Sequence, residues 1–329
     1  MTKFKVLTFV FCVLHFTFCI GCGRRVNPII PSKNIIGKCK TPGYAKDIFV
    51  IGNYAYIADG QAGLQVIDIS NPTTPTIVGW HDTEIYAYGV VVMDSIAYIA
   101  DGPSGGGLRL FNIRRPDSII ALGVDSYISS YEVFVIKREV QPQADSVFVF
   151  IAAKDKFQID NATDFNFPSL IGRCETPGGA CGVWGDSEYA YVANEQMGLQ
   201  IIDVRNISSP KIIGSYDTPG KALDVCVSGN YAYIADGREG LQIIDVVQPD
   251  TPKFVGSCPT PGYANKVFVF GNYAYIADGV AGLQVIDVSN PLTPSIISEC
   301  STPYTNSVYV TQQYIYLADR DEGLVIIEK

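Results

Sequence analysis

The sequence predicts an all-β protein whose chain folds as a closed ring of similar four-stranded sheets. Composition, an internal repeat and the match between the two chain ends support this prediction. Of the 329 residues, 31 are Gly and 19 are Pro, and both are unfavourable inside helices. Tyr, Val, Ile and Thr are abundant and favour strands. A chain of this length would ordinarily hold two or more domains, but a repeat that closes on itself accommodates it as one.

A short motif recurs along the chain at nearly constant spacing. Residues 52–60, 229–237 and 271–279 all read GNYAYIADG. Weaker copies end at Asp101, Asn194 and Asp319, and a degenerate copy ends at Ala153. The final positions of the seven copies are separated by 42, 52, 41, 42, 42 and 41 residues. The chain therefore contains seven units, and the third carries an insertion.

Each unit is predicted to form four strands, which in the first unit lie near residues 44–51, 54–58, 64–69 and 76–79. Turn residues separate them: Gly52 and Asn53, then Asp59 and Gly60, then the segment from Ser70 to Pro75. Tyr alternates with Ala in the second strand, so large and small side chains can interdigitate between neighbouring sheets.

The two ends of the repeat region complement each other. The last unit stops at residues 323–329, after its third strand. Residues 34–39, NIIGKC, instead resemble the fourth strands at 210–214 and 253–258. A ring in which the N-terminal strand completes the final sheet leaves no unpaired sheet edge at the chain ends. The prediction is a seven-bladed β-propeller of four-stranded blades over residues 34–329.

The third strands carry a family resemblance. Residues 64–68 and 283–287 read LQVID, while 199–203 and 241–245 read LQIID. These segments resemble the LVIVD repeat, which occurs in bacterial and archaeal surface proteins. The resemblance covers residues 34–329, is strongest in the first, fifth and sixth units, and implies a propeller without implying an activity.

The N-terminus predicts export. Lys3 and Lys5 precede an apolar run from Val6 to Ile20, which is too short to span a bilayer comfortably and is typical of a signal peptide. The run ends in FCIGC at 18–22, which resembles a bacterial lipobox, with Cys19 where Leu is usual. The resemblance implies a signal peptide at 1–21, a lipid on Cys22, a tether at 22–33, and an outer-membrane or cell-surface location. An ordinary signal peptide or an uncleaved anchor are the alternatives.

Charge and cysteine content limit the partners and the chemistry. The net charge of −9 makes nucleic acid an unfavourable partner. Six cysteines lie within 34–329, and none forms a C-x-x-C pair. Neighbouring sheets lie about 10 Å apart, whereas a disulfide requires Cα atoms within about 7 Å. We therefore expect mostly buried thiols, and Cys181 with Cys226 is the one pair worth checking.

Strand parity places the connections between units on the same face as the turn after each second strand. This face is predicted to carry the Thr-Pro-Gly segments and the Asp-Gly turns, and it is the candidate binding face. Its candidate residues are Tyr44, Tyr263, Tyr304, Asp59, Asp101, Asp236, Asp278 and Asp319. The aspartates form either an acidic collar for a partner or hydrogen bonds to the backbone of their own turns.

Catalysis has little support in the sequence. His81 is the one histidine after the signal segment, so neither a histidine triad nor a multi-histidine metal site can be built, and no cofactor is expected. Asp47, Glu132 and Asp224 share one position on the first strands of their units, where paired carboxyls would allow acid–base chemistry.

Three functions follow from these observations. The first is a surface lipoprotein whose propeller is a non-catalytic scaffold for a protein or glycan. The second is a carboxylate enzyme acting on glycans or another exported substrate. The third is an architectural envelope component with a fixed neighbour.

Overall fold

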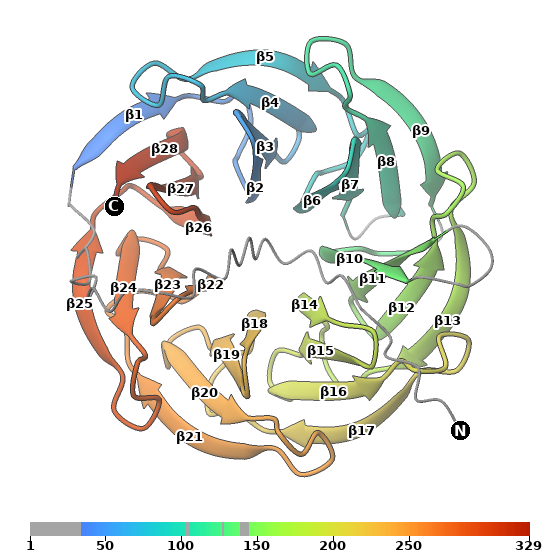
Figure 1. Ribbon diagram of the computed structural model, residues 1–329, viewed down its shortest axis with the longest axis vertical. Coiled ribbons are helices and arrows are strands. Elements are labelled where there is room, and N and C mark those ends of the chain that lie inside the picture. The colour runs from blue at the N-terminus through green and yellow to red at the C-terminus, as the bar shows by residue number, and fades with distance from the viewer. Residues whose placement is uncertain (1–33, 103–104, 127, 139–144) are drawn as a thin grey trace, which may run out of the picture.

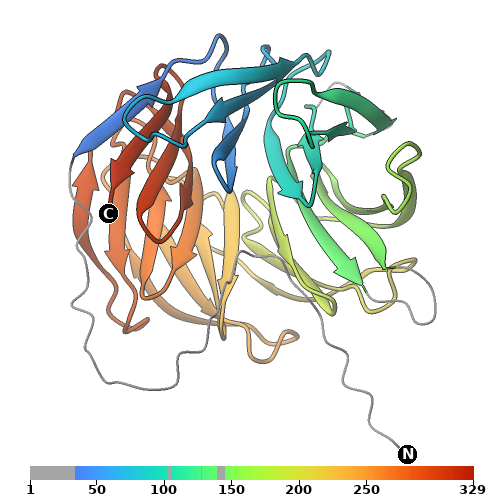
Figure 2. The same cartoon turned by 45° about the horizontal axis from the view of Figure 1, so that its top comes forward.

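Seven antiparallel sheets stand side by side around a central axis (Figures 1 and 2). The computed structural model describes residues 34–102, 105–126, 128–138 and 145–329, and all of its helix and strand elements there are β-strands. Among these residues no helix could cross a membrane. The predicted signal peptide at 1–21, the lipidation site Cys22 and the tether at 22–33 lie outside the described residues.

Each sheet, or blade, contains four strands, and the chain runs from the channel outward in every blade but the last (Figure 1). The inner strands are β2 (Asp47–Ile51), β6 (Gly89–Met93), β10 (Glu132–Arg138), β14 (Gly182–Gly185), β18 (Asp224–Ser228), β22 (Lys266–Phe270) and β26 (Thr305–Val310). The second strands are β3 (Tyr54–Ala58), β7 (Ile96–Ala100), β11 (Ser146–Ala153), β15 (Tyr189–Ala193), β19 (Tyr231–Ala235), β23 (Tyr273–Ala277) and β27 (Tyr314–Asp319). The third strands are β4 (Leu64–Asp68), β8 (Leu108–Asn112), β12 (Lys156–Asn161), β16 (Leu199–Asp203), β20 (Leu241–Asp245), β24 (Leu283–Asp287) and β28 (Gly323–Glu328). The outer strands are β5 (Thr76–His81), β9 (Ile120–Asp125), β13 (Ser169–Glu175), β17 (Lys211–Tyr216), β21 (Lys253–Cys258), β25 (Ser295–Cys300) and, in the seventh blade, β1 (Ile35–Cys39).

The N-terminal strand closes the ring as predicted. Strand β1 pairs antiparallel with β28, with Ile35 opposite Ile327 and Cys39 opposite Leu324. Both strands belong to the sheet that also holds β26 and β27. The seven-bladed propeller predicted from the sequence is therefore confirmed, including the blade shared by the two ends.

The hydrophobic core lies between blades rather than within a single central layer. Tyr56 and Leu64 of the first blade, for example, pack with Val90 and Phe111 of the second. Tyr98 and Tyr275, from the alternating Tyr-Ala strands, are fully buried. Each sheet therefore buries both of its faces against its neighbours, which explains why the second and third strands are apolar along nearly their whole length.

Inner strand β2 begins at Asp47 rather than at residue 44, so the predicted strand was too long. Gly43 and Tyr44 donate their backbone N–H groups to the Asp59 carboxylate and the Asp59 carbonyl, at 2.8 and 3.3 Å. These bonds fold the connection over the neighbouring turn and leave only the following residues extended. The connections and the Asp-Gly turns consequently share one face, which we call the Thr-Pro-Gly face.

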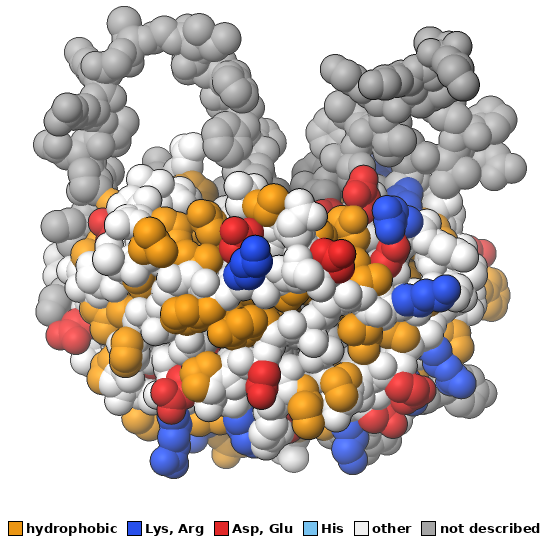
Figure 3. Space-filling model, turned by 90° about the horizontal axis from the view of Figure 1, so that it is seen from below, with side chains coloured by type: hydrophobic (Ala, Val, Ile, Leu, Met, Phe, Trp, Pro, Cys, Tyr) orange, Lys and Arg blue, Asp and Glu red, His pale blue; other side chains and the backbone are white. Residues whose placement is uncertain are grey.

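The outer side of the ring carries scattered apolar side chains. Trp80, Ile120 and Phe254 of the outer strands are each at least half exposed. On the side seen in Figure 3, hydrophobic side chains are interspersed with acidic and basic ones. The chemistry that distinguishes individual blades lies instead at the Thr-Pro-Gly face and in the channel.

Candidate binding site at the mouth of the central channel

A buried aspartate anchors each Thr-Pro-Gly connection. Thr41 Oγ1 donates to Asp59 Oδ1 at 2.6 Å, and the same bond joins Thr218 to Asp236 and Thr260 to Asp278. The second carboxylate oxygen accepts the backbone N–H of the connection glycine in all three blades, at 2.8 to 2.9 Å. The carboxylates thus satisfy donors of the preceding connection, which lies 16 to 18 residues away in sequence.

The candidate aspartates are not exposed on the face. Asp59, Asp101, Asp236, Asp278 and Asp319 all have no exposed surface. Burial raises the pKa of Asp59 and Asp236 to about 6, although their hydrogen bonds partly oppose this shift. Asp59, Asp236 and Asp278 direct their oxygens into the connections, whereas Asp319 Oδ1 accepts the backbone N–H groups of Asp321 and Glu322 in its own turn. The part of these carboxylates in any contact with a partner is therefore indirect, through the loops that they hold in place.

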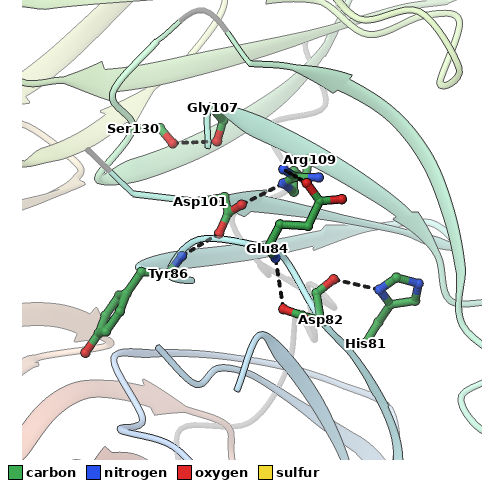
Figure 4. A network of polar contacts seen from close by, with 8 residues as sticks. All are labelled: His81, Asp82, Glu84, Tyr86, Asp101, Gly107, Arg109 and Ser130. Atoms are coloured by element: carbon green, nitrogen blue, oxygen red, sulfur yellow. Dashed lines mark hydrogen bonds and ion pairs between the residues drawn. The ribbon is translucent and has the colours of Figure 1, made fainter. Parts of the chain in front are cut away.

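The second blade keeps the threonine–aspartate contact, between Thr83 and Asp101, and adds an arginine to it (Figure 4). Asp101 Oδ1 accepts the backbone N–H of Tyr86 at 2.9 Å, and Asp101 Oδ2 accepts Arg109 Nε at 2.6 Å. Arg109 also pairs with the exposed Glu84 at 2.9 Å. The Tyr86 ring points away from this ionic group, as Figure 4 shows, and packs on Gly60, the turn glycine of the first blade.

The three candidate tyrosines occupy the same position in their blades but differ in exposure. Tyr263 and Tyr304 are partly buried, because each ring packs on the turn glycine of the preceding blade, Gly237 or Gly279. Tyr44 is 51% exposed. In the seventh blade, which precedes Tyr44 round the ring, Arg320 occupies the position of the turn glycine. The guanidinium carbon of Arg320 lies over the Tyr304 ring, 4.5 Å from its centroid. Tyr44 therefore has no glycine surface on which to pack.

An aromatic row lies beside Tyr44 on the first three blades. The rings of Tyr86 and Tyr88 are 4.9 Å apart, and those of Tyr88 and Tyr131 are 5.5 Å apart. The Lys46 ammonium sits 5.8 and 5.9 Å from the Tyr86 and Tyr88 ring centroids. All three rings are partly exposed. We call Tyr44, Tyr86, Tyr88 and Tyr131 the mouth tyrosines.

One position at the start of each inner strand forms a ring around the channel. In every blade the residue at this position pairs with an alanine of the second strand, as Asp47 does with Ala58. The seven residues of this channel ring are Asp47, Gly89, Glu132, Gly182, Asp224, Lys266 and Ser307. The shared position predicted for Asp47, Glu132 and Asp224 is thus confirmed by the strand pairing, and Lys266 joins them.

Lys266 connects the acidic members of the channel ring. Its ammonium lies 3.4 Å from Asp47 Oδ1. It also pairs with Glu132, whose blade is three blades from that of Lys266 by the shorter way round the ring. Asp47 also accepts a hydrogen bond from Ser307 Oγ at 2.7 Å. Asp47 and Asp224 also each accept a backbone N–H from the next blade. The donors are Val90, at 2.9 Å from Asp47, and Val267, at 3.0 Å from Asp224, and each directly follows the channel-ring residue of its own blade.

Burial controls the ionisation of this group. Burial raises the pKa of Glu132 to about 8, against the opposing charge of Lys266, and the carboxylates of Asp47 and Asp224 add to the increase. Burial also raises the pKa of Asp224. Burial by itself lowers the pKa of Lys266, but the three surrounding carboxyl groups outweigh it and hold that pKa well above its usual value. Lys266 is therefore charged, while Glu132 takes up a proton near neutral pH.

A cavity of about 120 Å³ adjoins the channel ring. Its wall includes an aromatic layer two residues further along the inner strands, formed by Phe49, Phe134, Trp184, Phe268 and Tyr309. The Phe134 and Trp184 centroids are 5.6 Å apart, and the Tyr309 ring lies 5.1 and 5.0 Å from Phe49 and Phe268. Charged groups and aromatic rings thus line one partly open cavity.

The remaining candidates lie away from this site or make no covalent link. No disulfide joins the six cysteines of the described region, so Cys181 and Cys226 are not bonded to each other. His81 is on the outer strand β5, where Nδ1 lies 2.7 Å from the Asp82 carbonyl and the ring packs on Phe111 at 4.8 Å. In the described part of the chain, no three His, Cys, Asp or Glu side chains are placed to hold a metal ion.

Sequence reasoning missed Lys266, Ser307 and the mouth tyrosines of the second and third blades. Lys266 and Ser307 were recoverable, because counting from the repeated alanine of the second strand gives their position directly. Tyr86, Tyr88 and Tyr131 follow connections that lack the Thr-Pro-Gly sequence. Their contacts with one another depend on how adjacent blades lie, which the repeat pattern does not specify.

Comparison with known proteins identifies the family. The model of the LVIVD repeat matches residues 42–83, 177–218, 219–260, 261–302 and 304–328, which together make up more than half of the chain. The chain therefore belongs to the LVIVD-repeat family. Among solved structures it is similar to the computationally designed Ika8 protein, with a TM-score of 0.65 and 8% identity over 90% of this chain and 99% of that one. That similarity concerns the fold alone. The comparison with curated proteins finds no match.

Proposed function

We propose that this protein is a bacterial surface lipoprotein whose propeller is a non-catalytic scaffold, and that it binds a protein or glycan partner at the Thr-Pro-Gly face. The observation that carries the proposal is the row of mouth tyrosines. Tyrosine combines a large apolar ring with a polar hydroxyl and is enriched at binding hot spots. The row is confined to the first three blades, so it gives an otherwise regular ring a preferred side.

The exposure of Tyr44 means that replacing it should affect partner binding more than folding. Tyr44 is half exposed and lacks the glycine contact that Tyr263 and Tyr304 make. Replacing Tyr44 therefore removes contact area for a partner but little internal packing. The loops beneath are fixed by buried carboxylates such as Asp59, so a partner meets a preorganised surface and loses little loop entropy on binding.

Partner capture from intact cells tests this proposal. We expect the double variant Tyr44→Ala/Tyr88→Ala to lose most capture, and Tyr263→Ala and Tyr304→Ala to lose less. Tyr54→Ala is the matched control, because Tyr54 begins strand β3 and lies at the opposite end of the blade. Unchanged capture by the double variant would contradict the proposal. Co-purification at fixed stoichiometry, insensitive to all these changes, would indicate an architectural role.

Lipidation is tested separately. If Cys22 is the acylated residue, labelled palmitate should enter the wild-type protein and should not enter the Cys22→Ser variant. Two or more acyl chains hold a protein on a membrane stably, so the variant should also leave the membrane fraction. Equal labelling of the two proteins would exclude Cys22 as the lipid attachment site.

A second candidate function, a carboxylate enzyme, is favoured by one specific observation. Glu132, with a pKa raised to about 8, lies in the same buried group as Asp47 and Asp224. A buried carboxyl group that keeps its proton near neutral pH is suited to act as a general acid. A panel of exported glycan substrates tests this function. Turnover that is lost in both Glu132→Gln and Asp224→Asn would favour it over the scaffold.

A further inference from the structure

The charges of the channel ring are not required by the propeller fold. The same position is Gly89 and Gly182 in two blades and Ser307 in a third, and all seven blades have the same strand arrangement. Burying a charge is costly unless other groups compensate for it. Asp47 is well compensated, because its oxygens accept from Ser307, Lys266 and Val90. Asp224 accepts the Val267 N–H and Glu132 pairs with Lys266, so one ammonium group serves a cluster of three carboxyl groups.

The channel ring has an excess of negative charge beside the cavity. Three carboxyl groups surround one Lys266, and the cavity wall includes all four residues. A cation that entered the cavity would compensate this excess, whereas an anion would meet the carboxylates at close range.

The aromatic layer selects the kind of cation. Five of the seven inner strands place an aromatic side chain in the cavity wall. Ring faces attract cations, and quaternary ammonium groups are bound in this way because they have no N–H donors and are weakly hydrated. A primary ammonium group would instead have to compete with Lys266 for the same carboxylate oxygens.

The volume of the cavity suits a small ligand. An engineered cavity of about 150 Å³ holds benzene, so a cavity of about 120 Å³ suits a molecule of similar or slightly smaller size.

We infer that the central-channel cavity binds a small quaternary ammonium compound such as choline. The ammonium lies between the aromatic layer and the carboxyl groups of Glu132 and Asp224. This inference goes beyond the proposed function and does not depend on it. It names a ligand class for the channel that is separate from the partner at the mouth tyrosines.

The two tryptophans of the chain make the cavity directly observable. Trp80 is 67% exposed on β5, whereas Trp184 lines the cavity. In the Trp80→Phe variant, fluorescence therefore reports on Trp184 alone. We expect choline to produce a saturable change in this signal. The uncharged isostere 3,3-dimethylbutan-1-ol has the same shape without the charge and should bind at least about tenfold more weakly, which corresponds to about 1.4 kcal/mol.

Variants of the cavity distinguish a specific site from general adsorption. Asp224→Asn should weaken choline binding about tenfold, because it removes an acidic group from the cavity. Glu132→Gln should have the same effect above about pH 8, where Glu132 loses its proton. Glu188→Gln, an exposed carboxylate at the opposite end of its blade, is the matched control and should bind as the parent does. If a cavity variant fails to fold, the comparison of choline with its isostere in the parent still tests the inference.

Several results would overturn the inference. They are the absence of a saturable signal with choline, equal binding of choline and 3,3-dimethylbutan-1-ol, or tighter binding of n-butylamine than of choline. Loss of choline binding with intact partner capture would remove this inference and leave the proposed function standing. Choline binding together with partner capture that is unchanged in the mouth-tyrosine variants would support this inference and contradict the proposed function.

Discussion

At the residue scale, one buried carboxylate in each regular blade accepts hydrogen bonds from a side chain and from the backbone of the preceding connection. Asp59 accepts a threonine hydroxyl and a glycine N–H, and Asp236 and Asp278 repeat the arrangement. In the fourth blade the aspartate is replaced by Asn194, whose side-chain nitrogen and oxygen are buried without partners among the described residues. Thr176 of that blade makes only a 3.5 Å contact with the Gly178 carbonyl. The chain thus contains its own comparison between a satisfied and an unsatisfied site.

Replacing the threonine should consequently cost more in one blade than in another. Thr218→Val removes the hydroxyl that donates to Asp236, and we expect about 2 kcal/mol of destabilisation, since hydrogen bonds to charged groups contribute about 1.5–3 kcal/mol. Thr176→Val should cost less than about 1 kcal/mol, because its hydroxyl has no carboxylate partner. Urea unfolding of both variants measures the difference. Equal losses would show that the Asp236 contact contributes nothing beyond side-chain packing.

At the element scale, the outer strands are held to the next blade by close backbone packing. Gly79 and Gly214 lie at the same position of β5 and β17, and a Cβ on either would fall 1.9 or 2.0 Å from a proline carbonyl oxygen in the next blade. The equivalent residue of β25 is Ser298. The blade that follows β25 is the seventh, whose third and outer strands come from opposite chain ends, so no turn joins them there. The glycine is replaced in the one blade where the facing turn does not exist.

Replacing the glycine with alanine should destabilise a blade that faces such a turn. The same side chain at Ser298, which faces no such turn, should have little effect. We expect Gly214→Ala to destabilise the protein by about 1–3 kcal/mol, the usual cost of overpacking, because the Pro249 carbonyl must move. Ser298→Ala is the matched control and should change stability by less than about 1 kcal/mol. Thermal unfolding of the two variants provides the measurement. A neutral Gly214→Ala would mean that adjacent blades can separate slightly at no cost.

At the scale of the whole molecule, the ring is stabilised where its two ends meet. Strand β1 contributes the only neighbour of β28 on its outer side, and Ile35 and Cys39 pack on the clusters at the junctions of the seventh blade. Without β1, the backbone donors and acceptors of β28 would lose their partners, and buried residues such as Ile326 and Ile327 would gain contact with water.

Deletion of residues 34–39 should therefore destabilise the entire ring. We expect a loss of at least about 3 kcal/mol, from the pairing with β28 and from the exposure of apolar surface. A circular permutant that links residue 329 to residue 34, with new ends between Gly229 and Asn230, is the control. It keeps β1 in place and should unfold near the parent. A deletion variant as stable as the parent would show that ring closure is energetically unimportant.

The channel ring makes the stability of the molecule depend on pH. Because the pKa of Glu132 is raised to about 8, the native protein holds a proton that the unfolded chain releases at lower pH. Stability from this group is therefore full at low pH and is lost as the pH rises through the folded-state value. Glu132→Gln should flatten the decrease in unfolding free energy between about pH 5 and pH 9. Urea midpoints across this range measure it, with Glu188→Gln as control. The same slope in parent and Glu132→Gln would contradict the assignment.

The accuracy of the sequence predictions followed the repetition in the chain. The seven units, the strands around the Tyr-Ala motif and the closing strand at 34–39 were all predictable, because seven copies repeat the same hydrophobic and turn pattern. The start of β2 at Asp47 was not, since it depends on hydrogen bonds from the connection to Asp59. The buried position of the candidate aspartates has the same cause. A sequence pattern that suits a turn does not indicate which neighbouring loop will donate to the carboxylate.

By itself, the sequence determined the class of fold, the number of blades, the closure of the ring and the equivalence of Asp47, Glu132 and Asp224. These features depend on periodicity, which is a local property of the chain. Only the tertiary structure decided that Lys266 reaches Glu132 across the channel, that Tyr44 lacks a glycine on which to pack, and that aromatic rings line a cavity beside the charges. These features depend on distances between blades, which arise only when residues far apart in sequence are brought round one axis.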